Sequence, residues 1–321
     1  MAEIKKDCGK KWNETIVNEI ITLIEHELDF ILSIQKFLNS EYIGDDCAYL
    51  KNLGIVITQD SMVEDIHFKT DFATPYQIGY KAAMVNISDV CASGAEPKYI
   101  TVALSLPKQT EIEFVREFYK GLKDACKDVE IVGGDITGSD KIYISITAIG
   151  ITKDRKISSR KNAKIGQKII VSGSHGSSGA GLAELLNGNR TGKFITKHLM
   201  PEAQLDFSRK IASTIKEDYA MMDTSDGLMD ALSQIANESG VLLDVDFDKI
   251  PYDKEIEEFK NYKNLILYGG EDYQLVATVT DPQDFTVIGE VKEGLGVKIG
   301  SKIYAKSDVE KNLYNHFEEN K

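Results

Sequence analysis

The chain has 321 residues, of which 42% are apolar and 28% are charged, and its formal net charge is -13 at pH 7. This length favours two domains, and the composition is that of a globular protein. The acidic balance argues against a nucleic-acid partner, which needs clustered Lys and Arg. No apolar run is long enough to span a membrane and the N-terminus has no signal-peptide pattern, so we expect a cytoplasmic protein without a membrane partner.

The first half mixes helices and strands. Apolar residues recur every three or four positions over residues 13–39, which predicts one or two amphipathic helices. Further helices are expected over 75–93 and 110–127. Strands are expected over 54–58, 100–106, 129–132 and 141–150. The polar, basic segment 151–164 follows a complete strand and marks a natural domain boundary.

The second half starts the pattern again. It predicts a strand over 168–172, a Gly-rich turn and a helix over 178–186. Later helices are expected from residue 201 and over 228–239. Later strands are expected over 241–247, 265–268, 273–279 and 285–291. Both halves therefore mix strands and helices.

Six short acidic motifs are spread along the chain. Each places a carboxylate beside Gly, Ser or Thr and close to a predicted strand or helix, so a turn and a ligand site both explain any one of them. The motifs lie at residues 44–46, 58–60, 86–89, 133–135, 223–227 and 269–272. Mg²⁺ prefers oxygen ligands and is usually held by a few carboxylates and substrate phosphates. Together the motifs predict a magnesium–nucleotide site assembled from distant segments, with Asp60 at the end of its strand.

Two further segments leave alternatives open. Residues 172–181 form a Gly-rich stretch between a strand and a helix, which suits either a phosphate cradle or a tight turn. The stretch matches neither a Walker A nor a dinucleotide-binding pattern. His67 follows closely on Asp60 and is either a structural histidine or a phosphate contact. No Ser-His-Asp or Cys-His set stands out, which favours direct phosphoryl transfer over a protein nucleophile.

These segments, in this order and spacing, resemble the thiamine-monophosphate kinase family. Its superfamily includes aminoimidazole ribonucleotide synthetase, selenophosphate synthetase and a hydrogenase maturation factor. The match runs from about Phe30 to near the C-terminus. It is carried by Arg160 and by residues 43–48, 80–89, 94–97, 132–135, 223–228 and 269–275. The Ser-Asp-Gly-Leu and Gly-Gly-Glu-Asp-Tyr segments favour the kinase within the superfamily.

The resemblance implies an α/β (α+β) protein with the two-domain aminoimidazole ribonucleotide synthetase-like fold. It divides the chain into a helical extension (1–29), an N-terminal domain that binds ATP and Mg²⁺ and pairs its sheet in a homodimer (30–152), and a C-terminal domain (153–321). The implied activity is ATP-dependent phosphorylation of thiamine monophosphate to thiamine diphosphate by direct in-line transfer with Mg²⁺.

The resemblance also implies roles for individual residues. Asp60, Asp135 and Asp226 would be catalytic, and His67, Glu271 and Tyr314 would meet the substrate. Thr58, Gly134, Arg160 and Ser225 would contact the nucleotide. The magnesium ligands would be Asp46, Thr58, Asp60, Asp89, Asp135, Asp223 and Asp226.

The chain departs from the family pattern in four places. Gln59 replaces a hydroxyl residue before Asp60, and residues 136–139 lack the Arg that usually follows Asp135. The only Trp is Trp12, so Tyr314 or Phe317 is the candidate for the C-terminal aromatic that packs on thiamine. About 25 residues precede the usual start of the family.

Two alternatives remain. One is another ATP-using member of the superfamily with a different substrate, although the chain lacks the C-terminal Cys of the hydrogenase factor. The other is a nucleotide-binding homologue without kinase activity. Retention of nearly every acid argues against the latter, because clustered carboxylates repel one another unless a cation neutralises them.

Overall fold

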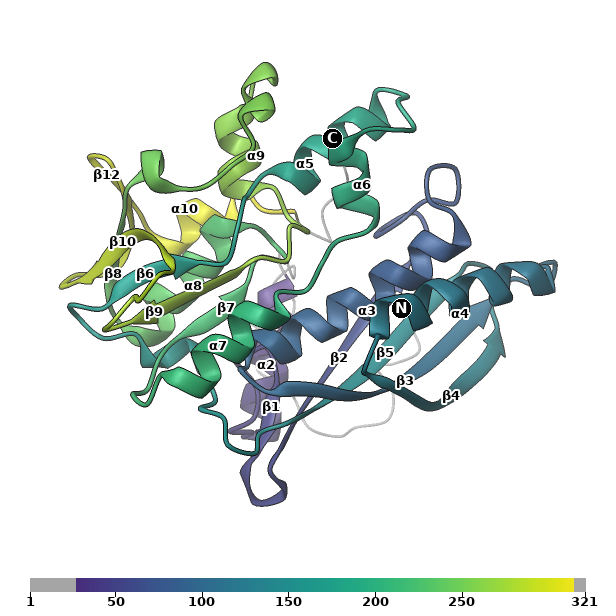
Figure 1. Ribbon diagram of the computed structural model, residues 1–321, viewed down its shortest axis with the longest axis horizontal. Coiled ribbons are helices and arrows are strands. Elements are labelled where there is room, and N and C mark those ends of the chain that lie inside the picture. Colours follow the sequence, from purple (N-terminus) through teal and green to yellow (C-terminus); the bar gives the residue numbers. More distant parts are fainter. Residues whose placement is uncertain (1–26, 315–321) are drawn as a thin grey trace, which may run out of the picture. The chain divides into compact units, whose positions relative to one another are not determined.

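The computed structural model describes residues 27–314 (Figure 1). The chain divides into a compact unit of residues 42–314 and a terminal unit, of which residues 27–41 are described. The terminal unit contains α2 (Glu27–Leu38), within the helical pattern expected over 13–39. The rest of that pattern, Trp12 and Phe317 lie outside the described residues. No helix in the described range is long and apolar enough to cross a membrane.

The first sheet has five strands in the order β1-β2-β5-β3-β4 and is antiparallel except for the β3–β4 pair. The strands are β1 (Ala48–Leu50), β2 (Ile55–Val63), β3 (Glu96–Leu106), β4 (Glu130–Gly138) and β5 (Tyr143–Ile151). Alternate residues of β5 are buried, as a sheet with one face on the core requires. Strand β2 pairs with β5 as far as Val63, so Asp60 lies inside a strand. The expectation that Asp60 ends its strand is wrong, because the residues after it continue the ladder.

Helices α3 (Pro75–Ala92) and α4 (Ile112–Cys126) lie side by side on one face of this sheet (Figure 1). Helix α3 begins with a capping box formed by Thr74 and Gln77, which satisfies backbone N–H groups of its first turn. The two helices approach closely at Gly79 and Gly121. A Cβ atom at either glycine would collide with a backbone carbonyl of the other helix.

The second sheet has seven strands in the order β12-β11-β8-β10-β6-β9-β7, of which only β11 and β8 pair in parallel. They are β6 (Lys168–Val171), β7 (Met221–Asp223), β8 (Leu242–Val245), β9 (Leu275–Val279), β10 (Thr286–Lys292), β11 (Gly296–Ile299) and β12 (Lys302–Tyr304). The accompanying helices are α5 (Ser177–Leu186), α6 (Lys193–Leu199), α7 (Leu205–Thr214), α8 (Leu228–Ser239), α9 (Tyr262–Tyr268) and α10 (Lys306–Glu310).

The strand expected over 265–268 is wrong, because these residues end helix α9. A short apolar run does not distinguish a strand from a buried helix. Here Ile266 and Leu267 are buried, and the helix packs against α5 and α8. The other main helices and strands of both halves confirm the expected α/β class.

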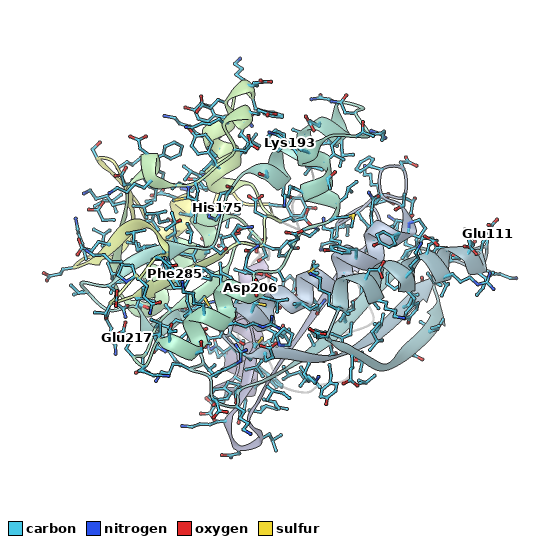
Figure 2. All side chains as sticks on the ribbon, viewed as in Figure 1. Glu111, His175, Lys193, Asp206, Glu217 and Phe285 are labelled. Carbon is cyan, nitrogen blue, oxygen red and sulfur yellow. The ribbon has the colours of Figure 1, made fainter. Side chains whose placement is uncertain are left out.

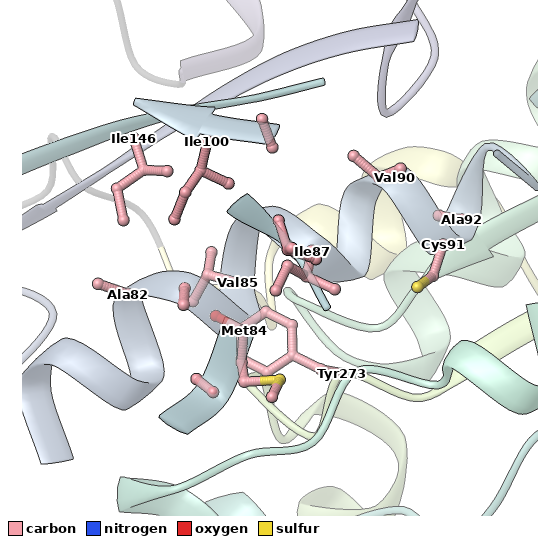
Figure 3. Packing of buried hydrophobic residues seen from close by; sticks show 14 of the residues in the cluster. Ala82, Met84, Val85, Ile87, Val90, Cys91, Ala92, Ile100, Ile146 and Tyr273 are labelled. Atoms are coloured by element: carbon pink, nitrogen blue, oxygen red, sulfur yellow. The ribbon is translucent and has the colours of Figure 1, made fainter. Parts of the chain in front are cut away.

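Helix α3 occupies the centre of the larger unit. Thirteen of its 18 residues are buried, so it has no solvent-facing stripe of the kind a surface helix shows. One core cluster runs continuously from the first sheet through α3 to Tyr273 and the inner strands of the second sheet (Figure 3). The polar residues of α3 therefore face other buried groups, and this places the candidate site.

Candidate active site

Three acids from distant segments meet beside the C-terminal half of α3. Asp46 comes from the loop before β1, Asp89 from α3 and Asp223 from the end of β7, and one carboxylate oxygen of each lies within 4.8 Å of the others. We call these three residues the acid cluster. The Thr58 hydroxyl donates to Asp89 at 2.7 Å, and the Ser88 hydroxyl donates to Asp223 at 2.5 Å.

The acid cluster lacks enough positive charge of its own. Burial, followed by repulsion from Asp60, Asp223 and Asp46, holds the pKa of Asp89 well above its usual range. Burial and Asp46 raise the pKa of Asp223 to about 7, against the lowering effect of hydrogen bonds from Ser88 and Ser225. An all-oxygen donor set with mutually repelling carboxylates fits a hard divalent cation.

Two more predicted ligands border the acid cluster. Asp60 is close enough to raise the pKa of both Asp89 and Asp223, and its backbone N–H donates to the Asn86 side chain at 3.0 Å. Burial raises the pKa of Tyr273, and Glu271, Asp60, Asp223 and Asp226 raise it further. Tyr273 is buried, and the carboxylates that act on it come from both halves of the chain.

Within residues 27–314, Arg160 is the basic residue that forms an ion pair with the acid cluster. Its Nη2 atom lies 3.0 Å from Asp46 Oδ1, and its backbone N–H donates to Asp45 at 2.7 Å. Its Nη1 atom donates to Gln234 of α8, whose amide nitrogen donates in turn to Asp230 at 2.6 Å. Arg160 therefore links Asp46 in the first half of the chain to Gln234 in the second half.

A second group of charges lies toward the N-terminal half of α3. Lys81 Nζ is 2.6 Å from Glu271 Oε1, and His198 Nδ1 is 3.4 Å from Glu271 Oε2. We call these three residues the paired cluster. Burial alone would raise the pKa of Glu271, but Lys81, His198 and His67 together hold it below its usual range. The predicted substrate residues His67 and Glu271 are therefore neighbours.

The Gly-rich stretch at 172–181 holds an acid of the protein itself. The backbone N–H groups of Gly176 and Ser178, at the start of α5, donate to the Asp272 carboxylate. The N-terminus of a helix attracts anions, and here the anion site is filled by this side chain. Of the two explanations the sequence left open, the tight turn is the one that these contacts support.

Comparisons with known proteins agree with this architecture. The chain matches the family models for the AIR synthase related protein N-terminal domain over residues 44–152 and C-terminal domain over residues 164–302. It is 36% identical to the thiamine-monophosphate kinase of Aquifex aeolicus, covering 91% of this chain and 98% of that protein. It is 35% identical to that of Bacillus subtilis, covering 86% and 93%.

Solved structures give the same result. One described as AaThiL complexed with AMPPCP and TMP superimposes with a TM-score of 0.83 at 34% identity, covering 97% of this chain and all of that one. The chain belongs to the thiamine-monophosphate kinase family. A HypE–HypF complex, at 22% identity and a TM-score of 0.72, shares the fold alone.

Three residues assigned by the family resemblance lie apart from the acid cluster. The register Asp135–Ala103–Ser145–Ser61 places Asp135 on the face of the first sheet opposite to Asp60. Within residues 27–314, no hydrogen bond or ion pair links Asp135 to the cluster. Gly134, its neighbour on edge strand β4, is exposed as well. Tyr314 is 58% exposed at the end of the larger unit.

The sequence pattern did not single out Lys81 or His198, and it included Asp272 and Tyr273 in a motif without giving either residue a role. A signal existed for Lys81, since a lysine between Ile78 and Val85 in an apolar run needs a buried partner. The family motif contained it, but no pattern named its partner 190 positions away.

Proposed function

We propose that this protein transfers the γ-phosphoryl group of ATP to the phosphate of thiamine monophosphate, giving thiamine diphosphate. The observation that carries the proposal is the acid cluster beside Arg160, in a chain that belongs to this kinase family. Both reactants are anions, so catalysis rests on positioning and neutralising charge.

The proposed roles differ between the two ends of the site beside α3. Mg²⁺, which neutralises the polyphosphate when bound, would be held by the acid cluster together with Thr58, Asp60 and Asp226. Arg160 and Ser225 would contact the nucleotide. His67 would hold the acceptor phosphate, and Glu271 would face the thiamine end. The roles of Asp135, Gly134 and Tyr314 stay predictions.

Transfer is proposed to occur without a phosphoenzyme. The Ser178 hydroxyl is hydrogen-bonded to His198 at 3.0 Å, but it uses the same Nδ1 atom that lies beside Glu271. A nucleophilic triad needs the acid and the hydroxyl on different ring nitrogens. Ser178 is also only 1% exposed.

Incubation with Mg²⁺, thiamine monophosphate and ATP labelled in the γ-phosphate tests this proposal. Label should appear in thiamine diphosphate, should be absent from acid-precipitated protein and should disappear when EDTA removes the metal. Stable labelling of the protein would contradict direct transfer. Consumption of an aminoimidazole precursor, with no thiamine diphosphate formed, would contradict the substrate.

The proposal includes a cytoplasmic homodimer. Edge strand β4 exposes Val132 and Ile136, and β5, which lies on the other side of β3, exposes Tyr143. These exposed apolar side chains support pairing through the first sheet. Burial of the free cysteines Cys47 and Cys91 suits a reducing compartment. Light scattering should give twice the chain mass of 35.7 kDa, and a monomer at micromolar concentration would contradict the dimer.

A further inference from the structure

Lys81 is a lysine enclosed in the protein. It lies on α3 and is 3% exposed, among residues that are otherwise small or apolar. An unpaired buried ammonium group is strongly unfavourable, so a lysine in this position requires a compensating acid. Glu271 supplies it from the other half of the chain, with 2.6 Å between Nζ and Oε1.

The loop that carries Glu271 is fixed on several sides. The Glu271 backbone N–H donates to the Ser225 carbonyl at 2.7 Å, and a φ of 66° places the residue in the left-handed region. The next residue, Asp272, anchors the loop to the first turn of α5. Ser178 of that turn also holds His198, which borders the second oxygen of Glu271.

This arrangement leaves Glu271 ionised and partly accessible. Lys81 pairs with one of its oxygens and His198 borders the other, and 27% of its side chain is exposed. An ionised carboxylate has about four acceptor positions, so it keeps capacity for a ligand. Lys81, by contrast, has a side chain that is only 4% exposed and does not reach the surface of the site.

We propose that Lys81 is a positioning residue, which holds the Glu271 carboxylate ionised and in one orientation for the thiamine monophosphate end of the site. This inference rests on the proposed function and deepens it. The competing explanation is an ion pair that only joins the two halves of the fold. The two explanations predict different kinetics, because loss of a purely joining ion pair would change KM for ATP and KM for thiamine monophosphate alike.

Several charged or titratable groups face Glu271. They are Lys81 from α3, His198 from α6, His67 after β2, and Asp272 and Tyr273 from its own loop. Burial and Lys81 lower the pKa of His198 to about 4, so this ring is neutral near pH 7. Lys81 is then the main cation that keeps Glu271 ionised, and its removal leaves burial and Asp272 to favour the protonated form.

Steady-state kinetics of Lys81→Met, Lys81→Arg and Lys193→Met test the proposal. Lys193 is the matched control, because it begins α6 (Figure 2) and pairs with Asp253 and Glu255 in an exposed position. Lys81→Met should raise KM for thiamine monophosphate about tenfold and change KM for ATP less than about twofold. Its KM for thiamine monophosphate should improve as pH rises, Lys81→Arg should recover most of the loss, and Lys193→Met should behave as wild type.

A comparison in the Glu271→Gln background keeps the proposal testable if Lys81→Met alone does not fold, and it completes a double-mutant cycle if that variant does fold. In Glu271→Gln protein, adding Lys81→Met leaves no lone buried charge and should change KM for thiamine monophosphate less than about twofold. A further tenfold rise in that background, or equal rises in both KM values for Lys81→Met, would overturn the inference. Turnover of thiamine monophosphate by wild-type protein tests the proposed function separately.

Discussion

The acid cluster and the paired cluster differ in how the protein treats buried charge. In the acid cluster, carboxylates repel one another and the pKa of Asp89 and Asp223 is raised. In the paired cluster, Lys81 compensates Glu271 and lowers its pKa. The first arrangement is complete only with an added cation, whereas the second is complete in the protein itself. On the proposed function, the charges that would bind metal and the charges that would orient the substrate are therefore built by opposite means.

One helix carries both arrangements. Lys81 and Asp89 are eight residues apart on α3, a separation of about 12 Å along the helix axis at 1.5 Å per residue. Because α3 is buried on both the first-sheet side and the second-sheet side, this spacing is rigid. The helix thus fixes the distance between the two ends of the proposed site.

The largest expected effect comes from removing one charge of the acid cluster. Asp89→Asn keeps an oxygen that accepts from Thr58 but weakens the metal site, so kcat/KM should fall at least about 100-fold. In metal-free buffer the same variant should melt at a higher temperature than wild type, since repulsion is relieved. Calorimetry with and without Mg²⁺ measures this. A lower melting temperature in metal-free buffer would show that the carboxylates are compensated in some other way.

The same kind of substitution in the paired cluster should have the opposite effect on stability. Glu271→Gln leaves Lys81 buried without its partner, so the free energy of unfolding should fall by about 2–3 kcal/mol, somewhat less than for a fully buried pair. Urea unfolding measures the change. The matched control is Glu255→Gln, which breaks an exposed pair with Lys193 and should leave stability unaltered. If Glu271→Gln and Glu255→Gln lowered stability equally, the paired cluster would be no different from an exposed ion pair.

The sequence predicted the acid cluster better than the paired cluster, for a physical reason. Asp46, Asp89 and Asp223 each lie in a short motif of acid and small residues beside a helix or strand. Such a local motif can be recognised without knowing which distant residues it contacts. Lys81 and His198 are defined by what they contact, and Glu271 is 190 positions from the first and 73 from the second. The position of Asp60 inside β2 depended on pairing with β5, which local composition does not determine.

The smallest expected effect concerns a buried titratable group outside both clusters. His175 (Figure 2) is 1% exposed, and within the described residues neither ring nitrogen has a hydrogen-bond partner. Burial lowers its pKa from 6.5 to about 3. Between these two values the unfolded chain binds a proton that the folded protein excludes, so stability is lost as pH falls below about 6.5.

Replacing this ring with an apolar side chain of similar size should remove that loss of stability at low pH. Relative to wild type, His175→Leu should gain about 1 kcal/mol of unfolding free energy between pH 6.5 and 5.5, at ~1.4 kcal/mol per pKa unit. The raised pKa of Asp223 acts in the opposite direction, favouring the metal-free fold at low pH, but it is common to both proteins and cancels in the difference. Urea unfolding at each pH measures the change. A difference that does not vary with pH would mean that the charged form of His175 finds a partner, as the charged form of Glu271 does in Lys81, and that His175 belongs with the compensated charges.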